Sequence, residues 1–160
     1  MDEQRRLRHA LGEFATGVVV VTANTQSDEP VGMTMSSFNS VSLDPPLVLF
    51  SIGCQSNSLP AFKAAESYAI NVLASEQEDI SNRFARALSD KWAGLSFVRG
   101  LGGAPLLPGA LAHFECLPYA QIEGGDHMIF LARVEKFAAR QDSVTPLLFM
   151  RGAYHRICNN

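Results

Sequence analysis

The sequence has little charge and no long apolar run. Only 18% of its 160 residues are charged, and the formal net charge at pH 7 is -3. No apolar run approaches the ~18 residues that a helix needs to cross a bilayer, so no membrane span is expected. No clustered basic stripe is present, which argues against a nucleic-acid surface. Disorder is also excluded, because 47% of the residues are apolar.

Cysteines are few, and several catalytic signatures are missing. Cys54, Cys116 and Cys158 are odd in number and far apart, so they form neither a disulfide framework nor a metal site. A reducing cytoplasm is the simplest location for such a chain. Nothing matches the phosphate loop G-x-x-x-x-G-K-[ST] or the nucleophile elbow G-x-S-x-G. The glycine-rich Gly100–Pro105 segment lacks the third glycine of the dinucleotide fingerprint.

The pattern of apolar residues predicts a mainly β protein. A chain of this length suits one domain, which we expect to span residues 1–160. Apolar and β-branched runs predict strands at residues 18–22, 31–38, 47–52, 68–73, 110–118, 119–122, 128–137 and 154–157. Short strands, tight turns and few helices favour a closed antiparallel barrel with peripheral helices over a doubly wound parallel sheet.

Three helices are expected around these strands. Apolar residues at helical spacing between positions 7 and 15 predict an N-terminal helix that ends at Gly17. A second helix is expected after Ser58, which suits an N-cap and precedes a proline in the first turn. The Ser75–Glu78 segment has a capping-box pattern, which predicts a third helix that continues to Ala87.

The most informative stretch is Thr34–Gly53, TMSSFNSVSLDPPLVLFSIG. Its first half is crowded with hydroxyl groups, and an apolar strand follows the rigid Asp44–Pro46 turn. Hydroxyls and open backbone groups beside an apolar wall suit a ligand with a polar edge and an apolar face, such as a flavin. The alternative is a Ser/Thr-rich surface strand, since these residues are mostly exposed in proteins.

Three further segments carry candidate binding groups. Residues 54–58 precede a helix, and their side-chain donors and free N–H groups would suit a phosphate, unless they form an ordinary helix cap. Arg83 and Arg86 follow on a later helix, where a guanidinium either reaches a phosphate or lies on a solvated face. The Gly124–His127 segment is a permissive turn, in which His127 either contacts a cofactor or makes a local hydrogen bond.

Together these segments resemble the short-chain flavin reductase family, whose fold is the FMN-binding split barrel. The matching segments follow one order along the chain: FATGV at 14–18, TMSSF at 34–38, SVSLDPPLV at 40–48, NVL at 71–73, RFA at 83–85, GAP at 103–105, GDH at 125–127, and PLL at 146–148 with Gly152 and Tyr154. The resemblance implies a mainly β, Greek-key-like antiparallel split barrel with a few peripheral helices.

The resemblance also implies which residues bind cofactors. Flavin would contact Thr34, Met35, Ser36, Ser37, Ser40, Val41, Ser42, Ser51, Ile52, Gly53, Ser56, Asn57, Ser58, Arg83, Phe84 and Ala85. His127 and Tyr154 would contact the nicotinamide nucleotide. Two features depart from the family pattern. Met35 stands where a small residue is common, and Gln55 and Asn57 stand where a basic residue often occurs.

The function implied by this resemblance is that of an NAD(P)H:flavin oxidoreductase. Hydride would pass from nicotinamide C4 of NADH or NADPH to N5 of FMN or FAD, with no general base required from the protein. A homodimer and a separate monooxygenase that receives the reduced flavin are also implied. Two alternatives stay open: a flavin- or haem-binding split barrel without turnover, and oxidation of a pyridoxine-type phosphate, which would call for more basic residues around the phosphate.

Overall fold

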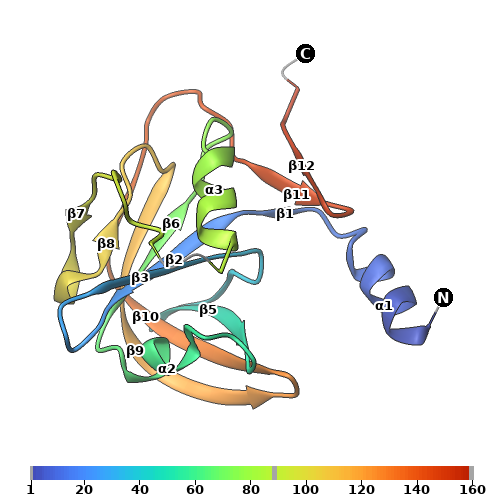
Figure 1. Cartoon of the computed structure of the whole chain (residues 1–160). Helices are drawn as coiled ribbons and strands as arrows, with labels where there is room; N and C mark the ends of the chain where they lie inside the picture. Colours follow the sequence, from blue (N-terminus) through green and yellow to red (C-terminus); the bar gives the residue numbers. More distant parts are fainter. Residues whose placement is uncertain (1, 88–89, 159–160) are drawn as a thin grey trace.

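The computed structural model of the chain describes residues 2–87 and 90–158. Its helices are α1 (Glu3–Leu11), α2 (Leu59–Ala64) and α3 (Glu78–Ala85), with a short 3-10 helix, η1 (Leu101–Gly103). Its strands are β1 (Thr16–Gly17), β2 (Val19–Asn24), β3 (Pro30–Met35), β4 (Asn39–Leu43), β5 (Pro46–Gly53), β6 (Tyr68–Val72), β7 (Val98–Arg99), β8 (Pro105–Leu106), β9 (Ala112–Gly124), β10 (His127–Ala139), β11 (Leu148–Met150) and β12 (Ala153–His155) (Figure 1). The fold is therefore mainly β, as predicted.

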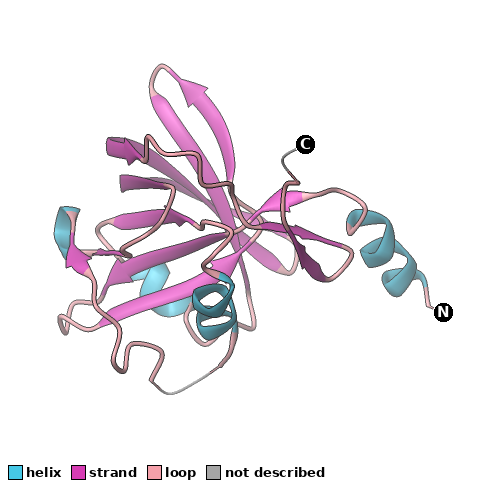
Figure 2. Cartoon of the chain, turned by 90° about the horizontal axis from the view of Figure 1, so that it is seen from above, coloured by secondary structure: helices cyan, strands magenta, loops and turns pink. Residues whose placement is uncertain are grey.

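Seven strands form one antiparallel sheet in the order β3-β2-β6-β9-β10-β5-β4. Strands β3 and β4 lie at opposite ends of this order, although only Ser36–Phe38 separates them in the chain. So short a connection spans at most roughly 14 Å, so the sheet must curl until its two edges approach each other. No ladder joins β3 to β4 in the described residues, and this seam is the split of the barrel. Figure 2 shows the strands turning around a common interior.

Aromatic rings fill the interior of the barrel. Phe50, Phe62, Tyr68 and Phe130 are fully buried, and their ring centroids lie 5.1 to 6.5 Å apart. Such spacings are typical of offset-stacked and edge-to-face pairs, which add to the free energy of burying each ring. Strand β5, which follows the cis Asp44–Pro45 turn, brings Phe50 into this cluster.

A second apolar cluster lies on the outer face of the sheet, under α3. Strand β2 belongs to both clusters: Val19 and Val21 point into the barrel, whereas Val20 packs outward against Phe84 and its neighbours. Because side chains alternate along a strand, burial on both faces explains the unbroken apolar run that begins at Val18. The outer cluster holds α3 against the sheet, and α3 in turn forms one side of the site described below.

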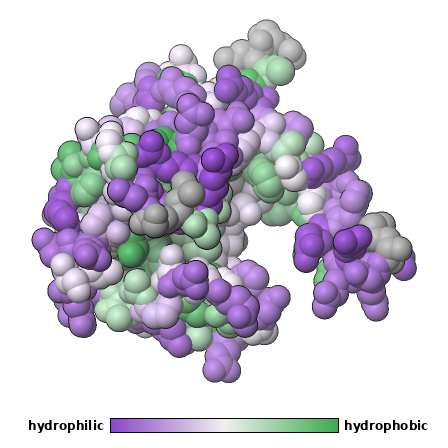
Figure 3. Space-filling model, viewed as in Figure 1, coloured by the Kyte–Doolittle hydropathy of each residue, from purple (hydrophilic) through white to green (hydrophobic). Residues whose placement is uncertain are grey.

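The N-terminal helix differs from its prediction. It ends at Leu11, with Gly12 as its C-cap, and Gly17 belongs to β1. The predicted end at Gly17 is wrong because the chain leaves the helix before Phe14, so the apolar residues of positions 7–15 do not share one helical face. None of the residues of α1 is buried. Figure 3 shows α1 as a mostly hydrophilic projection that stands apart from the body.

The predicted capping box of the third helix is also wrong. Helix α3 begins at Glu78 with Gln77 as its N-cap residue, and the N–H of Ser75 donates to the carbonyl of Thr145 instead. The Gln77 side chain accepts from the N–H of Ala74 at 3.0 Å, so it closes the turn before the helix. Among the described residues, no helix is long and apolar enough to cross a membrane.

Candidate functional site

A cleft of about 610 Å³ opens beside β3, between the loop that follows β5 and the C-terminal end of α3. It is lined by Met33, Thr34, Gln55, Ser56, Asn57, Ser58, Phe84, Ala85, Arg86, Ala87 and Lys91. This volume falls within the range of about 300–1,000 Å³ that is usual for small-molecule sites. A smaller pocket of about 220 Å³ shares Thr34 and Ala85 with the cleft and therefore adjoins it.

Gly32 allows α3 to lie close to β3. A Cβ atom at this position would come within 2.8 Å of the Phe84 ring and 3.1 Å of Trp92, and such contacts would force the rings to move. The Phe84 and Trp92 rings pack edge to face with centroids 4.8 Å apart, and Trp92 packs on Phe97 in the same way at 4.9 Å. This ring stack fixes the segment after residue 90 against α3.

Gln55–Ser58 forms one side of the cleft, which we call the neutral wall. Its side chains are hydroxyls and amides, with no charged group. The Ser56 hydroxyl accepts from the N–H of Ser58 at 3.3 Å and lies 3.9 Å from the Met33 sulfur. The N–H groups of Ser56 and Leu59 also donate inside the turn. These two N–H groups are therefore not available to a ligand.

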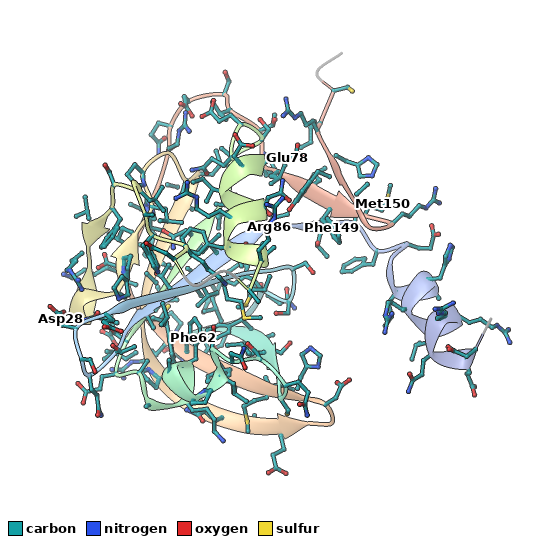
Figure 4. The ribbon with its side chains drawn as sticks, in the orientation of Figure 1. Asp28, Phe62, Glu78, Arg86, Phe149 and Met150 are labelled. Carbon is teal, nitrogen blue, oxygen red and sulfur yellow. The ribbon has the colours of Figure 1, made fainter. Side chains whose placement is uncertain are left out.

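Phe84–Ala87 and Lys91 form the opposite side, which we call the cationic wall. Figure 4 labels Arg86 at the C-terminal end of α3 and Glu78 at the other end. Lys91 is half-buried, and its ammonium donates to the carbonyls of Phe84 at 3.1 Å and Gly32 at 3.4 Å. Burial lowers the pKa of the Lys91 ammonium below its ordinary value. Two cations therefore border the cleft on this side.

Arg83, the arginine singled out by its family motif, points elsewhere. Its guanidinium donates to the carbonyls of Ala93 at 2.8 Å and Lys91 at 3.4 Å, and it does not line the cleft. Lys91 was not among the predicted site residues, because the sequence around it, DKW at 90–92, matches no binding motif. Its proximity to the cleft comes from the ring stack and from Arg83, which are contacts between separate segments.

Two hydroxyls of the hydroxyl-rich stretch bind other parts of the chain. The Thr34 hydroxyl donates to the carbonyl of Ser81 at 2.7 Å and so ties β3 to α3. The Ser37 hydroxyl accepts from the N–H of Ser51 at 3.0 Å and approaches the carbonyl of the same residue at 3.2 Å. This side chain takes the place of a ladder partner beside the seam of the barrel.

The structure brings part of the predicted flavin set together. Thr34, Ser56, Asn57, Ser58, Phe84 and Ala85 line the main cleft, and Met35 and Ser36 line the adjoining pocket. Ser37, Ser51 and Gly53 lie on neighbouring backbone, whereas the side chain of Ile52 is buried in the barrel interior. Ser40, Val41 and Ser42 lie on β4, across the seam, and line neither pocket.

Tyr154, a predicted nicotinamide residue, lines the smaller pocket. Its hydroxyl lies 2.6 Å from the Ser81 hydroxyl and donates to the side-chain oxygen of Asn82 at 3.2 Å, which ties β12 to α3.

His127, the other predicted nicotinamide residue, lines neither pocket but pairs with Gly53, two residues before the neutral wall. Its ring lies 2.7 Å from the Asp126 carboxylate, and this hydrogen bond holds the pKa of the Asp126 carboxyl below its ordinary value.

The combined features of the cleft fit a flat aromatic ligand that carries a phosphate. Met33 and Ala85 provide apolar surface. The neutral wall offers hydrogen-bonding groups, and Arg86 and Lys91 provide positive charge. In the described part of the chain, no three His, Cys, Asp or Glu residues gather to hold a metal ion.

The profile of the flavin reductase like domain matches residues 11–158, which is nearly the whole chain. The chain belongs to this family. The structure accordingly has the split barrel that the resemblance implied, and solved flavin reductases share the fold.

Individual family members are similar over most of this chain. It is 45% identical over 158 residues to the FMN reductase (NADH) SmoA of Agrobacterium fabrum, covering 97% of this chain and 87% of that protein. It is 43% identical over 150 residues to the reductase component of the flavin-dependent trigonelline monooxygenase of Acinetobacter baylyi, covering 94% of this chain. This chain therefore spans only about half of the trigonelline relative, 48% of its length.

A solved structure of the same family holds ligand fragments. The NADH:FAD oxidoreductase SgcE6 of Streptomyces globisporus, in complex with NAD and FAD fragments, superimposes with a TM-score of 0.91 at 39% identity. The match covers 98% of this chain and 93% of SgcE6. The similarity therefore extends through both walls of the cleft and the C-terminal strands.

Proposed function

We propose that this chain is a NAD(P)H-dependent flavin reductase that takes FMN or FAD and uses NADH in preference to NADPH. The observation that carries the proposal is the cleft itself, in which a neutral hydrogen-bonding wall faces a cationic wall in a member of the flavin reductase like family. The preference for NADH is supported by the names of relatives, which include an FMN reductase (NADH) and an NADH:FAD oxidoreductase.

The protein's own contribution is to bind and orient the two cofactors. Flavin and nicotinamide together supply the hydride chemistry when both are bound. Ser56 and Asn57 would hydrogen-bond the polar part of the flavin, while Met33 and Ala85 would cover its apolar surface. Tyr154, held by Ser81 and Asn82, lines the adjoining pocket, through which the nicotinamide ring could approach the flavin ring. No general acid or base is needed from these side chains.

A crossed steady-state assay tests the proposal. NADH and NADPH are each mixed with the purified protein and with riboflavin, FMN or FAD, and loss of the near-ultraviolet band of the reduced nicotinamide is followed. We expect multiple turnovers with NADH and a phosphorylated flavin. No loss of absorbance with any flavin would contradict the proposal. A protein that purifies yellow but is reduced only once would indicate a flavin-binding module instead.

We also propose a homodimer. Three large apolar side chains in and just beyond α1 are mostly exposed: Leu7 by 60%, Leu11 by 66% and Phe14 by 78%. Helix α1 buries none of its residues against its own chain, so these side chains are left uncovered. A second copy could cover them. Light scattering at micromolar concentration should give twice the monomer mass, and a monomer mass would contradict this proposal.

A separate monooxygenase that consumes the reduced flavin is the proposed partner. The trigonelline relative is named as the reductase component of a monooxygenase, and other relatives are named as reductase subunits of flavin-dependent monooxygenases. Reduced flavin would leave the cleft and pass to the oxygenase. Rapid release, measured as flavin lost in gel filtration after reduction, should exceed release of oxidised flavin, whereas equal retention would argue against this role.

A further inference from the structure

Arg83 and Lys91 form a linked pair around the cationic wall. Arg83 binds the backbone of the segment after residue 90 through the carbonyls of Lys91 and Ala93. Lys91 in turn binds back to the carbonyls of Gly32 and Phe84. The arginine thus holds the lysine's main chain, and the lysine's side chain lies against β3 and the end of α3.

These contacts leave Lys91 able to meet an anion. An ammonium group has three donors. Gly32 and Phe84 supply its two acceptors in the described part of the chain, so one donor remains beside the cleft that Lys91 lines. The neutral wall approaches from the other side, because Ser56 touches Met33, the residue next to Gly32 on β3. A phosphate between the two walls would meet hydroxyls on one side and this ammonium on the other.

We propose that Lys91 supplies the charge by which the cleft selects phosphorylated flavins over riboflavin, and that Arg83 is the positioning residue that holds it there. This inference rests on the proposed function, since it concerns a flavin in the same cleft. Arg86 also lines the cleft, but its side chain is exposed and must be ordered when a ligand binds. The Lys91 side chain is already held by two hydrogen bonds, so less of its conformational freedom is lost when a ligand binds. It is also half-buried, so its charge is less screened by water.

Quenching of flavin fluorescence gives the dissociation constants that test this assignment. For the wild type we expect FMN to bind at least about tenfold more tightly than riboflavin, the size of one charge-assisted contact. In Lys91→Met the constant for FMN should rise about tenfold, while that for riboflavin stays within about twofold. Lys91→Arg keeps the charge and should retain most of the preference. Lys136→Met, an exposed lysine on β10, is the matched control and should change neither constant.

The role of Arg83 needs a double-mutant comparison. Arg83→Met should weaken FMN binding about fivefold and leave riboflavin unchanged, because the lysine it positions becomes mobile. The double variant should bind FMN no more weakly than Lys91→Met alone. Additive losses would show that Arg83 contacts the phosphate itself and would overturn its positioning role.

The outcomes separate this inference from the proposed function. If the wild type binds neither flavin, the proposed function fails and the inference fails with it. If it binds FMN and riboflavin equally, or if Lys91→Met leaves FMN binding unchanged, only the inference is overturned. A thermal melt of each variant shows whether it folds. Should Lys91→Met fail to fold, Lys91→Gln replaces it, and retained FMN preference in that variant overturns the inference.

Discussion

The two walls of the cleft face the same space but are built in different ways. The neutral wall is one short loop, and its turn is closed by bonds between neighbours such as Ser56 and Ser58. The cationic wall is assembled from α3 and a later segment, which long-range contacts of Gly32, Arg83 and Trp92 hold together. Hydrogen bonding to a ligand is thus positioned locally, and charge is positioned by packing. Damage to packing should therefore impair one wall and spare the other.

The largest expected effect comes from Gly32→Ala. The added methyl group would lie 2.8 Å from the Phe84 ring, so α3 and the ring stack must shift. We expect a loss of about 1–3 kcal/mol in the free energy of unfolding, which is usual for overpacking, and the FMN preference should fall with it. Urea unfolding and flavin titration measure the two effects.

Gly17→Ala is the control for this change, because nothing lies within 4 Å of a Cβ atom at that position. If Gly32→Ala proved as stable as Gly17→Ala and bound FMN normally, then the cationic wall would not depend on this close approach.

Asn57→Asp should give the neutral wall a negative charge. A carboxylate in the cleft would repel a phosphate, and we expect the dissociation constant for FMN to rise about three- to tenfold while that for riboflavin changes little. Added salt should reduce the effect, since Asn57 is exposed. Asn39→Asp makes the same charge change on β4, outside the cleft, and should leave both constants unchanged. An equal effect from both variants would mean that only net charge matters.

His127→Ala probes the rim beside the neutral wall. We expect the KM for NADH to rise several-fold, while flavin binding stays within about twofold, because His127 lines neither pocket. Asp126→Asn should give a smaller rise, since it alters only the carboxylate that orients the ring. Steady-state kinetics and flavin titration together decide this. Equal loss of NADH use and flavin binding would argue against a contact between His127 and the nicotinamide nucleotide.

The smallest expected effect is that of Thr34→Val. It removes the hydrogen bond to the Ser81 carbonyl and should lower the free energy of unfolding by about 1 kcal/mol. Flavin affinity should change less, because this hydroxyl is already engaged with α3. Ser40→Ala, on the exposed face of β4, should change neither quantity. If Thr34→Val left the stability unaltered but greatly weakened flavin binding, the Thr34 hydroxyl would be a direct ligand contact instead.

Most of the fold could be predicted from the sequence because its signals are local. Strand β2 was visible in its β-branched run, and helix α2 was visible from Ser58 and the following proline. Strand β4 was not predicted, since Asn39–Leu43 is short and polar and pairs only because β5 lies beside it. The end of α1 was missed because apolar spacing continues past Gly12 although the helix does not.

The site was harder to predict, because its residues come together through contacts that no local pattern records. The neutral wall followed from Ser56, Asn57 and Ser58, which are neighbours in the chain. In the cationic wall, Phe84, Ala85 and Arg86 were also candidates, but Lys91 was not, since it reaches the cleft only through contacts with β3 and α3. Composition marks Ser37 as a possible donor, whereas its bond to Ser51 depends on how the sheet curls.

The ring stack also gives the protein an internal optical reporter. Trp92 is the only tryptophan in the 160 residues, and its ring packs on Phe84 at the edge of the cleft. Indole emission from the whole chain therefore arises beside the cationic wall. A flavin in the cleft would absorb that emission at close range. Ligand entry and any displacement of this wall can then be followed in the unlabelled protein, with no dye and no added residue.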